Sequence, residues 1–340
     1  MKKQTVATLL TILFLVCAMT AAFPAKATPR ILEVGKTGYP YATISAAVAA
    51  ASPGDTILVH PGIYTENVVV NTDGLTIRSG LLRRGWCRRR AYVTIVDGDG
   101  SDVFTIDADD VTIDGFTIRN GDSGILYIGW NNKFTQNIIH NNEVGIKHWF
   151  FGTHVDASYS KIEKNEIYGN NIGIHVWFPG IHRSMIIRNN IHDNAGSGMS
   201  FRGCSRNTIG YNNIHDNGGS GIALYESDEN TIVLNRVVGN VYYGVRIQDA
   251  VWNNTVLINT VKDNGEHGIY IGDFYESSAD HMEVLLNKVI NNGGDGIHIG
   301  SYAYENRIEY NIALNNYEYD LYDEGVDTIL NNNIYGTSYP

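Results

Sequence analysis

Short segments in which apolar and polar residues alternate run through most of the chain. Four of them are "GIAL" at 221–224, "GVRI" at 244–247, "GIYI" at 268–271 and "GIHI" at 296–299. Alternation with a period of two is typical of β-strands that bury one face, because successive side chains of a strand point to opposite sides. The apolar spacing of three and four residues that marks an amphipathic helix does not occur within these units. The pattern therefore predicts short strands.

These segments belong to an internal repeat. The twelve residues "NNIHDNAGSGMS" at 189–200 return nearly unchanged as "NNIHDNGGSGIA" at 212–223. The skeleton N-x-[IV]-x-x-N, followed by G-[IVM]-x-[IVLF], recurs with its first asparagine at 137, 165, 190, 213, 235, 259, 287, 311 and 333. Such a period indicates stacked repeats, and Ile and Val stand where a leucine-rich repeat needs leucine. The predicted fold class is all-β, a single-chain parallel β-helix of roughly ten rungs spaced by about 4.8 Å.

Two residue types recur at the turns between strands. We expect the asparagines to adopt the left-handed conformation that a sharp turn requires, and their stacked side chains to hydrogen-bond along the axis of the β-helix. We expect the glycines to take positive φ in the next tight turn. These glycines lie at 124, 145, 173, 198, 221, 244, 268 and 296.

The first residues predict export. Residues 1–27 have a basic start, an apolar centre and a small-residue ending, Ala25-Lys26-Ala27, which is the pattern of a secretory signal peptide. An uncleaved membrane anchor is the alternative, because the apolar run at 6–23 is nearly long enough to span a bilayer. With the leader removed, we expect no membrane span and a secreted, periplasmic or cell-surface location.

The rest of the chain divides in two. Residues 28–54 form an N-terminal segment in which 41–51, rich in alanine and followed by Pro53-Gly54, predicts a short helix. Residues 55–340 form the β-helix repeat domain. Because the first rung of a solenoid exposes an apolar end, we expect this helix to act as its cap.

The charge balance narrows the possible partners. Without the leader's Lys2, Lys3 and Lys26, 22 basic residues remain against 36 acidic ones, a net charge of −14. A chain this acidic is disfavoured as a partner of nucleic acid. Cys87 and Cys204 alone do not make a disulfide framework. We expect a monomer whose partner is a polysaccharide or cell-surface glycan.

The alternation places candidate ligand-binding residues in two outward files. The middle residue of each G-[IVM]-x-[IVLF] segment points away from the core, which gives a first file of Lys147, His175, Ser200, Ala223, Arg246, Tyr270 and His298. Two residues further along lies a second file of Trp149, Trp177, Arg202, Tyr225 and Gln248. Aromatic faces interspersed with polar groups suit sugar rings. The alternative is an ordinary sheet surface, because β-propensity alone enriches Tyr and Trp.

Arg246, Tyr270 and His298 are the candidate catalytic residues of the first file. They lie on three successive rungs, so their Cβ atoms should be about 5 Å apart. An arginine to neutralise a uronate and a Tyr or His to move a proton are what a polysaccharide lyase or epimerase needs. Because these side chains point outward, we expect their replacement by alanine to change stability by no more than about 0.5 kcal/mol.

Carboxylates follow the same strands at equivalent places on adjacent rungs: Glu226, Asp249 and Asp273. They could assist the proton transfer, hold Ca²⁺, or act as paired acid and base in hydrolysis. A solvated acidic edge is the alternative.

A pair of histidines is the candidate metal site. His192 and His215 occupy the same corner of adjacent rungs, beside Asp193 and Asp216. Two stacked imidazoles could bind Cu²⁺ or Zn²⁺. A histidine pair stacked only by the repeat is the alternative, since no third histidine ligand is evident.

The segments "YATISAAVAAASPGDTILVHPGIYTENVVV", "GLTIRS", "TIVDGDG" and "VTIDGFTIRN" together resemble the start of NosD-type and pectin-lyase-like β-helix proteins. The resemblance implies right-handed coiling and makes copper a candidate cofactor. It does not assign an activity, because that scaffold carries lyases, hydrolases, epimerases and proteins with no catalytic role. Two functions follow: an exported polysaccharide-binding protein, with lyase or epimerase activity on uronates, or a noncatalytic NosD-type accessory protein that is structural or copper-linked.

Overall fold

The computed structural model describes residues 28–80, 91, 93–149, 157–272 and 278–339. The leader expected at 1–27 lies outside the described residues. The compact unit Ile31–Pro340 contains the elements below. Among the described residues, no helix has the length and apolar character needed to cross a membrane.

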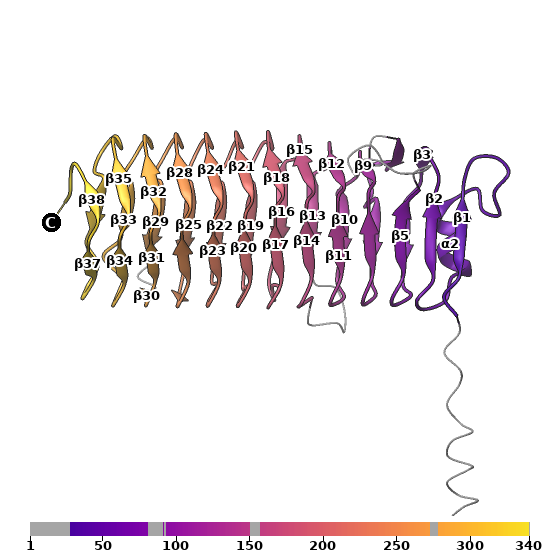
Figure 1. Cartoon of the computed structure of the whole chain (residues 1–340), viewed down its shortest axis with the longest axis horizontal. Helices are drawn as coiled ribbons and strands as arrows, with labels where there is room; N and C mark the ends of the chain where they lie inside the picture. Colours follow the sequence, from indigo (N-terminus) through magenta and orange to yellow (C-terminus); the bar gives the residue numbers. More distant parts are fainter. Residues whose placement is uncertain (1–27, 81–90, 92, 150–156, 273–277, 340) are drawn as a thin grey trace, which may run out of the picture. The chain divides into compact units, whose positions relative to one another are not determined.

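The unit is a parallel β-helix in which each turn contributes one strand to each of three sheets (Figure 1). Sheet A consists of β1 (Ile31–Val34), β2 (Thr56–Val59), β5 (Thr76–Ser79), β8 (Thr112–Asp114), β11 (Lys133–Thr135), β14 (Lys161–Glu163), β17 (Met185–Ile187), β20 (Thr208–Gly210), β23 (Thr231–Val233), β27 (Thr255–Leu257), β31 (Glu283–Leu285), β34 (Arg307–Glu309) and β37 (Ile329–Asn331).

Sheets B and C follow sheet A within each turn. Sheet B consists of β3 (Gly62–Thr65), β6 (Thr94–Asp97), β9 (Thr117–Arg119), β12 (Ile138–His140), β15 (Glu166–Tyr168), β18 (Asn190–His192), β21 (Asn213–His215), β24 (Arg236–Val238), β28 (Thr260–Lys262), β32 (Lys288–Ile290), β35 (Ile312–Leu314) and β38 (Ile334–Tyr335). Sheet C consists of β4 (Val68–Val70), β7 (Phe104–Ile106), β10 (Ser123–Tyr127), β13 (Val144–His148), β16 (Ile172–Val176), β19 (Met199–Arg202), β22 (Ile222–Tyr225), β25 (Val245–Gln248), β29 (Ile269–Gly272), β33 (Ile297–Ile299) and β36 (Leu321–Asp323). A small additional pair joins β26 (Val251–Trp252) to β30 (Ala279–Asp280).

The all-β solenoid is confirmed, with about twelve turns rather than ten. The count was too low because the asparagine skeleton begins only at Asn137, while the earlier turns form the same sheets without it. Sheet A also begins before the expected boundary at residue 55, since β1 pairs in parallel with β2. The short helix is present as α2 (Ile44–Ala50), whose N-cap Thr43 accepts a hydrogen bond from the backbone of Ala46.

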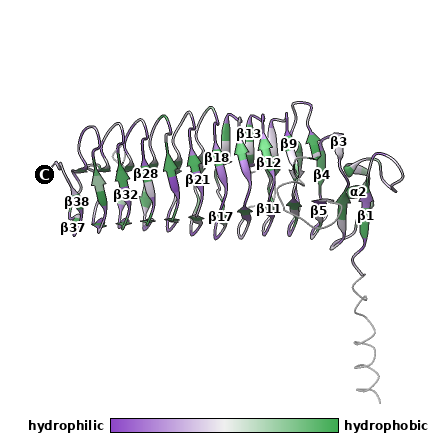
Figure 2. Ribbon diagram, turned by 45° about the horizontal axis from the view of Figure 1, so that its top comes forward, coloured by the Kyte–Doolittle hydropathy of each residue, from purple (hydrophilic) through white to green (hydrophobic). Residues whose placement is uncertain are grey.

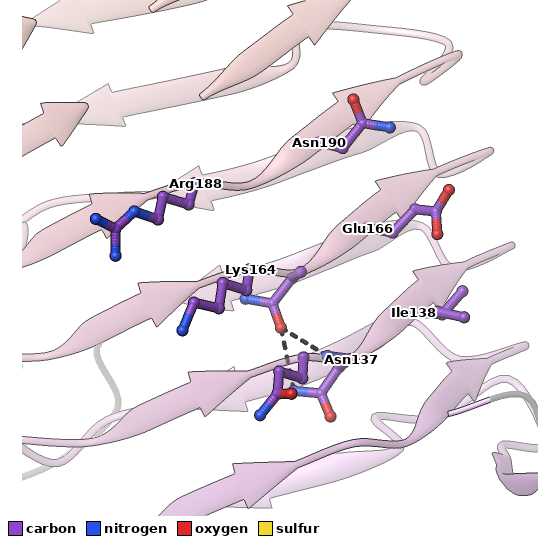
Figure 3. A pocket seen from close by; sticks show the side chains of 8 residues that line it. Asn137, Ile138, Lys164, Glu166, Arg188 and Asn190 are labelled. Atoms are coloured by element: carbon purple, nitrogen blue, oxygen red, sulfur yellow. Dashed lines mark hydrogen bonds between the residues drawn. The ribbon is translucent and has the colours of Figure 1, made fainter. Parts of the chain in front are cut away.

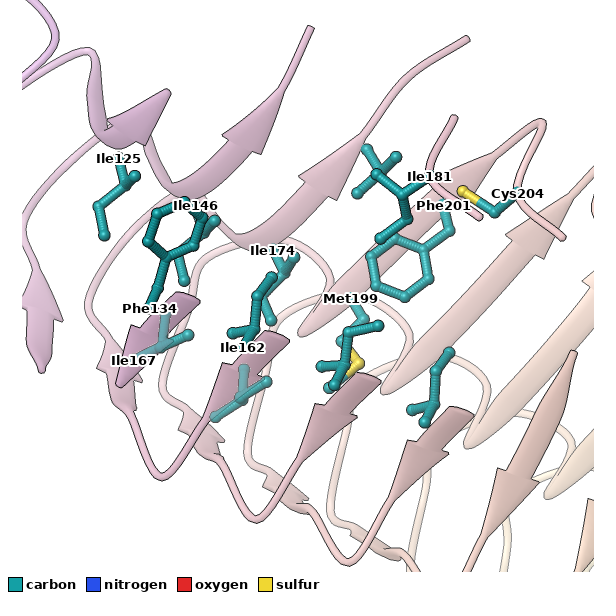
Figure 4. Packing of buried hydrophobic residues seen from close by; sticks show 14 of the residues in the cluster. Ile125, Phe134, Ile146, Ile162, Ile167, Ile174, Ile181, Met199, Phe201 and Cys204 are labelled. Atoms are coloured by element: carbon teal, nitrogen blue, oxygen red, sulfur yellow. The ribbon is translucent and has the colours of Figure 1, made fainter. Parts of the chain in front are cut away.

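Inward-facing aliphatic side chains form one continuous core. Ile209 of β20, Ile214 of β21 and Leu224 of β22 are fully buried in a single turn. Figure 4 shows the same stacking of isoleucines in neighbouring turns, and Figure 2 shows the hydropathy alternating along the strands. The buried side of α2 joins this core through Ile44, Ala47 and Val48. In Figure 1 the helix lies beside β1 and β2, so it covers the first turn as expected.

Asparagine ladders run through the corners between the sheets. At the corner from sheet A to sheet B, each asparagine Oδ1 accepts a hydrogen bond from the backbone N–H of the ladder asparagine one turn earlier. The ladder consists of Asn137, Asn165, Asn189, Asn212, Asn235, Asn259, Asn287, Asn311 and Asn333. Stacking is therefore confirmed, but the register expected at Asn190 and Asn213 was wrong, because the preceding residue of each "NN" pair faces inward.

The ladder asparagines do not take the left-handed conformation. Positive φ belongs to the residue just before each one, for example Lys164, Arg188 and Tyr211. This residue turns the chain, and the asparagine after it points inward to bond the neighbouring turn. Long side chains are tolerated at the positive-φ position because they extend into solvent while the buried ladder fixes the backbone.

The repeat glycines also have a different role from the expected one, because none of them has positive φ. A Cβ on Gly145 would lie 2.5 Å from the carbonyl oxygen of Gly173 and 2.8 Å from Cγ2 of Ile167. Comparable close approaches recur at Gly221 and Gly268. Glycine is needed here because the backbone of the next turn and a core side chain occupy the space of a side chain.

Candidate functional site

The outward face of sheet C carries the first predicted file in register. Parallel pairing aligns Lys147 with His175 and continues through Ser200, Ala223, Arg246, Tyr270 and His298, one residue per turn. The file extends one turn further, to Tyr322. The alternation of the sequence located these positions correctly, and the roles assigned to them stay predictions.

The tryptophans of the second file stack on one another instead of offering open faces. The rings of Trp149 and Trp177 lie 6.1 Å apart and nearly parallel, and the Arg202 guanidinium lies 5.3 Å from the centre of the Trp177 ring. Since Trp149 and Arg202 belong to the turns before and after, they cover Trp177 from two sides. Trp177 is nevertheless 39% exposed. A sugar on this file would therefore meet ring edges more than ring faces.

The charges at the start of the face are largely compensated. Arg202 donates two hydrogen bonds to the carboxylate of Glu226, at 3.1 and 2.6 Å. These bonds raise the pKa of Arg202 and lower the pKa of Glu226. Lys147 lies 3.2 Å from a carboxylate oxygen of Asp122. Burial, together with the charge of Lys147, lowers the pKa of His175.

Arg246 is held by an amide and by aromatic rings, whereas Arg202 is bound directly by a carboxylate. Its Nε donates to Oε1 of Gln248 at 2.5 Å, and Nε2 of Gln248 donates to Oδ1 of Asp249 at 2.9 Å. The guanidinium also lies over the rings of Tyr243 and Tyr225, at 4.8 and 5.7 Å. The amide of Gln248 therefore links Arg246 to the carboxylate of Asp249.

The expected carboxylate ladder is present in part. The backbone N–H of Glu226 donates to the carbonyl oxygen of Asp249 at 3.0 Å, so the two residues occupy equivalent places on adjacent turns. Asp273 lies outside the described residues. The Glu226 carboxylate is bound by Arg202, and the Asp249 carboxylate accepts a hydrogen bond from Gln248.

The end of the file forms a cluster around His298, which we call the His298 cluster: Arg246, His267, Tyr270, Asp295 and His298. Nδ1 of His298 donates to Oδ2 of Asp295 at 2.7 Å, and the backbone N–H of Tyr319 donates to the other carboxylate oxygen at 2.9 Å. Asp295 is only 1% exposed. The buried carboxylate of Asp295, which accepts two hydrogen bonds, thus fixes the ring of His298. Nε2 of His298 is left as the nitrogen that can accept a proton.

His267 lies beside this pair in a different protonation environment. Its Nδ1 accepts a hydrogen bond from the backbone N–H of Asp295 at 2.8 Å, and its ring centre is 4.6 Å from that of His298. Burial and the neighbouring His298 lower the pKa of His267 to about 4, although Asp295 opposes the shift. His267 is therefore neutral at physiological pH.

Tyr270 departs from the exposure expected of it. It is 5% exposed, because the rings of His298, Tyr243 and His267 surround it at 5.0, 5.4 and 5.7 Å. Its hydroxyl extends along its own strand, 3.2 Å from the place where a Cβ on Gly272 would lie. Glycine in the second file makes room for this ring. The exposure on which the small expected cost of replacing Tyr270 rested is therefore not present, and we now expect a larger cost.

Sequence reasoning missed Asp295 and His267. Both directly precede a repeat glycine, where neighbouring turns carry Ser220 and Tyr243. Comparing that column between turns would have revealed the change to titratable side chains. It also missed Tyr322, whose ring stacks on His298 at 4.5 Å, because the last turn lacks the repeat glycine.

The histidine pair of sheet B does not converge on a common point. The rings of His192 and His215 stack at 4.9 Å with an angle of 5° between their planes, and each Nδ1 bonds the carboxylate of the next residue at 2.7 Å. The nitrogen lone pairs lie in the ring planes, so those of two parallel rings 4.9 Å apart lie in separate planes and do not meet at one ion. The geometry favours a stacked pair over two ligands of one ion.

Another group has a donor set that suits a metal. Among the described residues, His267, Asp295 and His298 form the one group of three His, Cys, Asp or Glu side chains whose ligand atoms all lie within 4.8 Å of one another. Two imidazoles and a carboxylate are typical ligands of Cu²⁺ or Zn²⁺. The three side chains are therefore of the kinds that bind copper, although Asp295 and His298 are also hydrogen-bonded to each other.

The fold and the outward site define the class as right-handed parallel β-helix proteins. The chain belongs to the NosD family, whose model, described as "Periplasmic copper-binding protein (NosD)", matches residues 50–270 and 184–339. No curated protein sequence matches this chain.

Solved structures with the same right-handed fold include carbohydrate-active enzymes. The A-modules of the mannuronan C-5 epimerases AlgE6 and AlgE4 from Azotobacter vinelandii are similar at TM-scores of 0.62 and 0.63, with 14% and 15% identity, and cover 87% and 88% of this chain and 94% and 93% of their own. DFA-IIIase from Arthrobacter chlorophenolicus A6 without its lid is similar at 0.62, with 14% identity, covering 89% of this chain and 94% of its own. At such identities these similarities show the fold alone.

Proposed function

We propose that this protein is exported, binds uronate-containing polysaccharide along the outward face of sheet C, and transfers a proton at a uronate in the His298 cluster. The observation that carries the proposal is His298, oriented by the buried Asp295 and aligned with Tyr270 and Arg246 on successive turns. The expected leader and the periplasmic description of the family support a location in the periplasm or at the cell surface.

The proposed chemistry starts from the acidic proton beside the sugar carboxylate. Nε2 of His298 accepts the proton from C5, and the electron pair of the broken C–H bond passes into the carboxylate, whose charge Arg246 balances. Return of a proton from the Tyr270 hydroxyl to the opposite face of C5 would give the epimer. In a lyase, the same electron pair would form the C4–C5 double bond and expel the 4-linked sugar oxygen, which would take a proton from the Tyr270 hydroxyl.

Titration with acidic oligosaccharides tests whether the outward face of sheet C binds uronates. We expect oligomers of mannuronate or galacturonate to bind, and Arg246→Ala to weaken binding by roughly tenfold or more, because a charge-assisted contact is lost. Arg236→Ala is the matched control, since Arg236 is an exposed arginine on sheet B. Equal affinity of the two variants would refute a uronate site at Arg246.

A second function is favoured by the donor group of the same cluster. His267, Asp295 and His298 would hold a copper ion, and the protein would then act as the noncatalytic accessory protein of the NosD type. Calorimetry and electron paramagnetic resonance with Cu²⁺ separate the two functions. Tight 1:1 binding that is lost in Asp295→Asn and kept in Asp193→Asn favours the copper function, and its absence leaves the polysaccharide function.

A further inference from the structure

The corner between sheets A and B carries a group of cations far from the cluster described above. The positive-φ residues of three successive turns at this corner are Gln136, Lys164 and Arg188. Figure 3 shows the side chains of Lys164 and Arg188 extending side by side from neighbouring turns. They border a hollow of about 260 Å³, also lined by Ile138, Glu166 and Asn190. Sheet C lies on a different side of each turn, so the corner is a separate surface.

The charges at the corner are unbalanced. Lys164 and Arg188 are exposed, and neither forms an ion pair with another described residue. On the adjoining face of sheet A, Lys133 and Lys161 share the single carboxylate of Glu163, at 3.4 and 3.0 Å. Burial would raise the pKa of Glu163, but the two lysines outweigh it and lower the pKa. The four cations outnumber the three carboxylates of this corner, which are Glu163, Glu166 and Asp114, the partner of Gln136, on a chain whose net charge is −11.

The rest of the hollow offers groups of other kinds. Ile138 points outward in register with Glu166 and Asn190, yet it is only 6% exposed. It lies at the floor of the hollow beside the carboxylate of Glu166 and the amides of Gln136 and Asn190, which also bond Asp114 and Asn213. An apolar surface for a ring, hydrogen-bonding groups for hydroxyls and cations for a carboxylate are together what an acidic sugar requires.

We propose that this corner is a second binding site, which holds a uronate chain along the axis of the β-helix with sugar carboxylates at Lys164 and Arg188. Successive turns repeat at about 4.8 Å, a distance comparable to the length of one sugar unit, so neighbouring carboxylates of the chain would meet neighbouring turns. The site stands independently of the function proposed for sheet C, because it uses none of the same residues. It would hold a polymer on the protein without acting on it.

Calorimetry with hexamers of galacturonate or mannuronate tests the second site in the Arg246→Ala background, where the sheet C site is weakened. We expect one binding event, weakened by roughly tenfold or more in Lys164→Ala/Arg188→Ala. The control is Arg236→Ala/Lys288→Ala, which removes the same charge from exposed positions of sheet B. Circular dichroism establishes that each variant is folded.

Three results would overturn the proposal. Equal binding by the corner variant and the control variant would mean that only net charge matters. Binding of a neutral glucose hexamer as tight as that of the uronate hexamer would remove the role of the cations. Binding of inorganic phosphate as tight as that of the hexamer would reduce the corner to a simple anion site. The two proposals can fail separately. Binding at the corner without binding at sheet C contradicts only the sheet C site, and binding at sheet C without binding at the corner contradicts only the corner site.

Discussion

Single residues show how closely the turns of this β-helix approach one another. The repeat glycines have ordinary backbone angles, and their value is the absence of a side chain where the next turn passes. We predict that Gly145→Ala lowers the free energy of unfolding by about 1–3 kcal/mol, because its Cβ would overlap the backbone of Gly173.

Urea unfolding measures this effect, with Gly62→Ala as the matched control. Gly62 lies in a strand, and the nearest atom to its hypothetical Cβ is 3.4 Å away, an ordinary contact. If the two substitutions cost the same, the steric account of the repeat glycines is wrong.

His267 of the cluster makes stability depend on pH. Burial and His298 lower the pKa of His267 to about 4 in the folded protein, whereas an unfolded chain takes up this proton near pH 6.5. Below pH 6.5 the unfolded state therefore binds the extra proton first, and the contribution of His267 to stability falls as the pH drops from 6.5 towards 4.

We predict that His267→Gln loses less stability than the wild type over this pH range. Denaturant unfolding at pH 7 and pH 4.5 checks it, with His281→Gln, which changes an exposed histidine, as the control. A wild-type pH dependence in His267→Gln would show that other groups cause the loss.

At the scale of the elements, buried asparagine ladders hold neighbouring strands in register. Oδ1 of Asn212 accepts hydrogen bonds from the backbone N–H and the side-chain amide of Asn189, at 2.9 and 3.0 Å, and its own amide donates to the carbonyl oxygen of Ile186 at 2.9 Å. Removing the side chain leaves buried partners of these bonds unsatisfied.

We predict that Asn212→Ala costs about 3 kcal/mol or more, because each buried group left without a partner costs about 1–3 kcal/mol. Asn213→Ala, at the next residue, should cost less than about 1 kcal/mol, since Asn213 faces outward and bonds Asn190 at the surface. Thermal and chemical unfolding compare them. A larger cost for Asn213→Ala would reverse the register described above.

The same ladders show what the sequence could and could not predict about the elements. The period of two and the recurring "NN" pairs indicated parallel stacking and aligned the outward files correctly, because both depend only on alternation. In the two "NN" pairs the skeleton itself selects the first asparagine, because Ile191 and Ile214 lie two residues after Asn189 and Asn212. The pattern could not predict the left-handed residue before each ladder asparagine, since Lys164 or Leu234 at such a position carries no recognisable turn signal.

At the scale of the whole molecule, the sequence predicted the positions of the candidate site residues. It did not predict their burial or their contacts with one another. Arg246, Tyr270 and His298 were expected on one file, and the pairing of the strands aligns them. The burial of Tyr270 and the bond between Asp295 and His298 arise from side chains that meet across turns. Such contacts depend on rotamers and on the space that Gly272 leaves, neither of which the repeat pattern encodes.

We propose a rigid scaffold with two outward surfaces, one on sheet C for proton transfer and one at the corner of sheets A and B for holding the polymer. On such a scaffold, variants of one surface should leave the other intact, because the core between them is continuous. The central proposal is that His298 removes the C5 proton of a uronate.

Exchange of the C5 hydrogen of a uronate oligomer in D₂O, followed by nuclear magnetic resonance, tests that claim most directly. Removal and return of the proton must introduce deuterium at C5 of the epimer or of unreacted sugar, whereas a lyase would form an unsaturated product with its own signals. We predict exchange or unsaturation with the wild type, and neither with His298→Gln. Oligomers that bind the wild type without exchange or unsaturation, or unchanged reaction in His298→Gln, would contradict it.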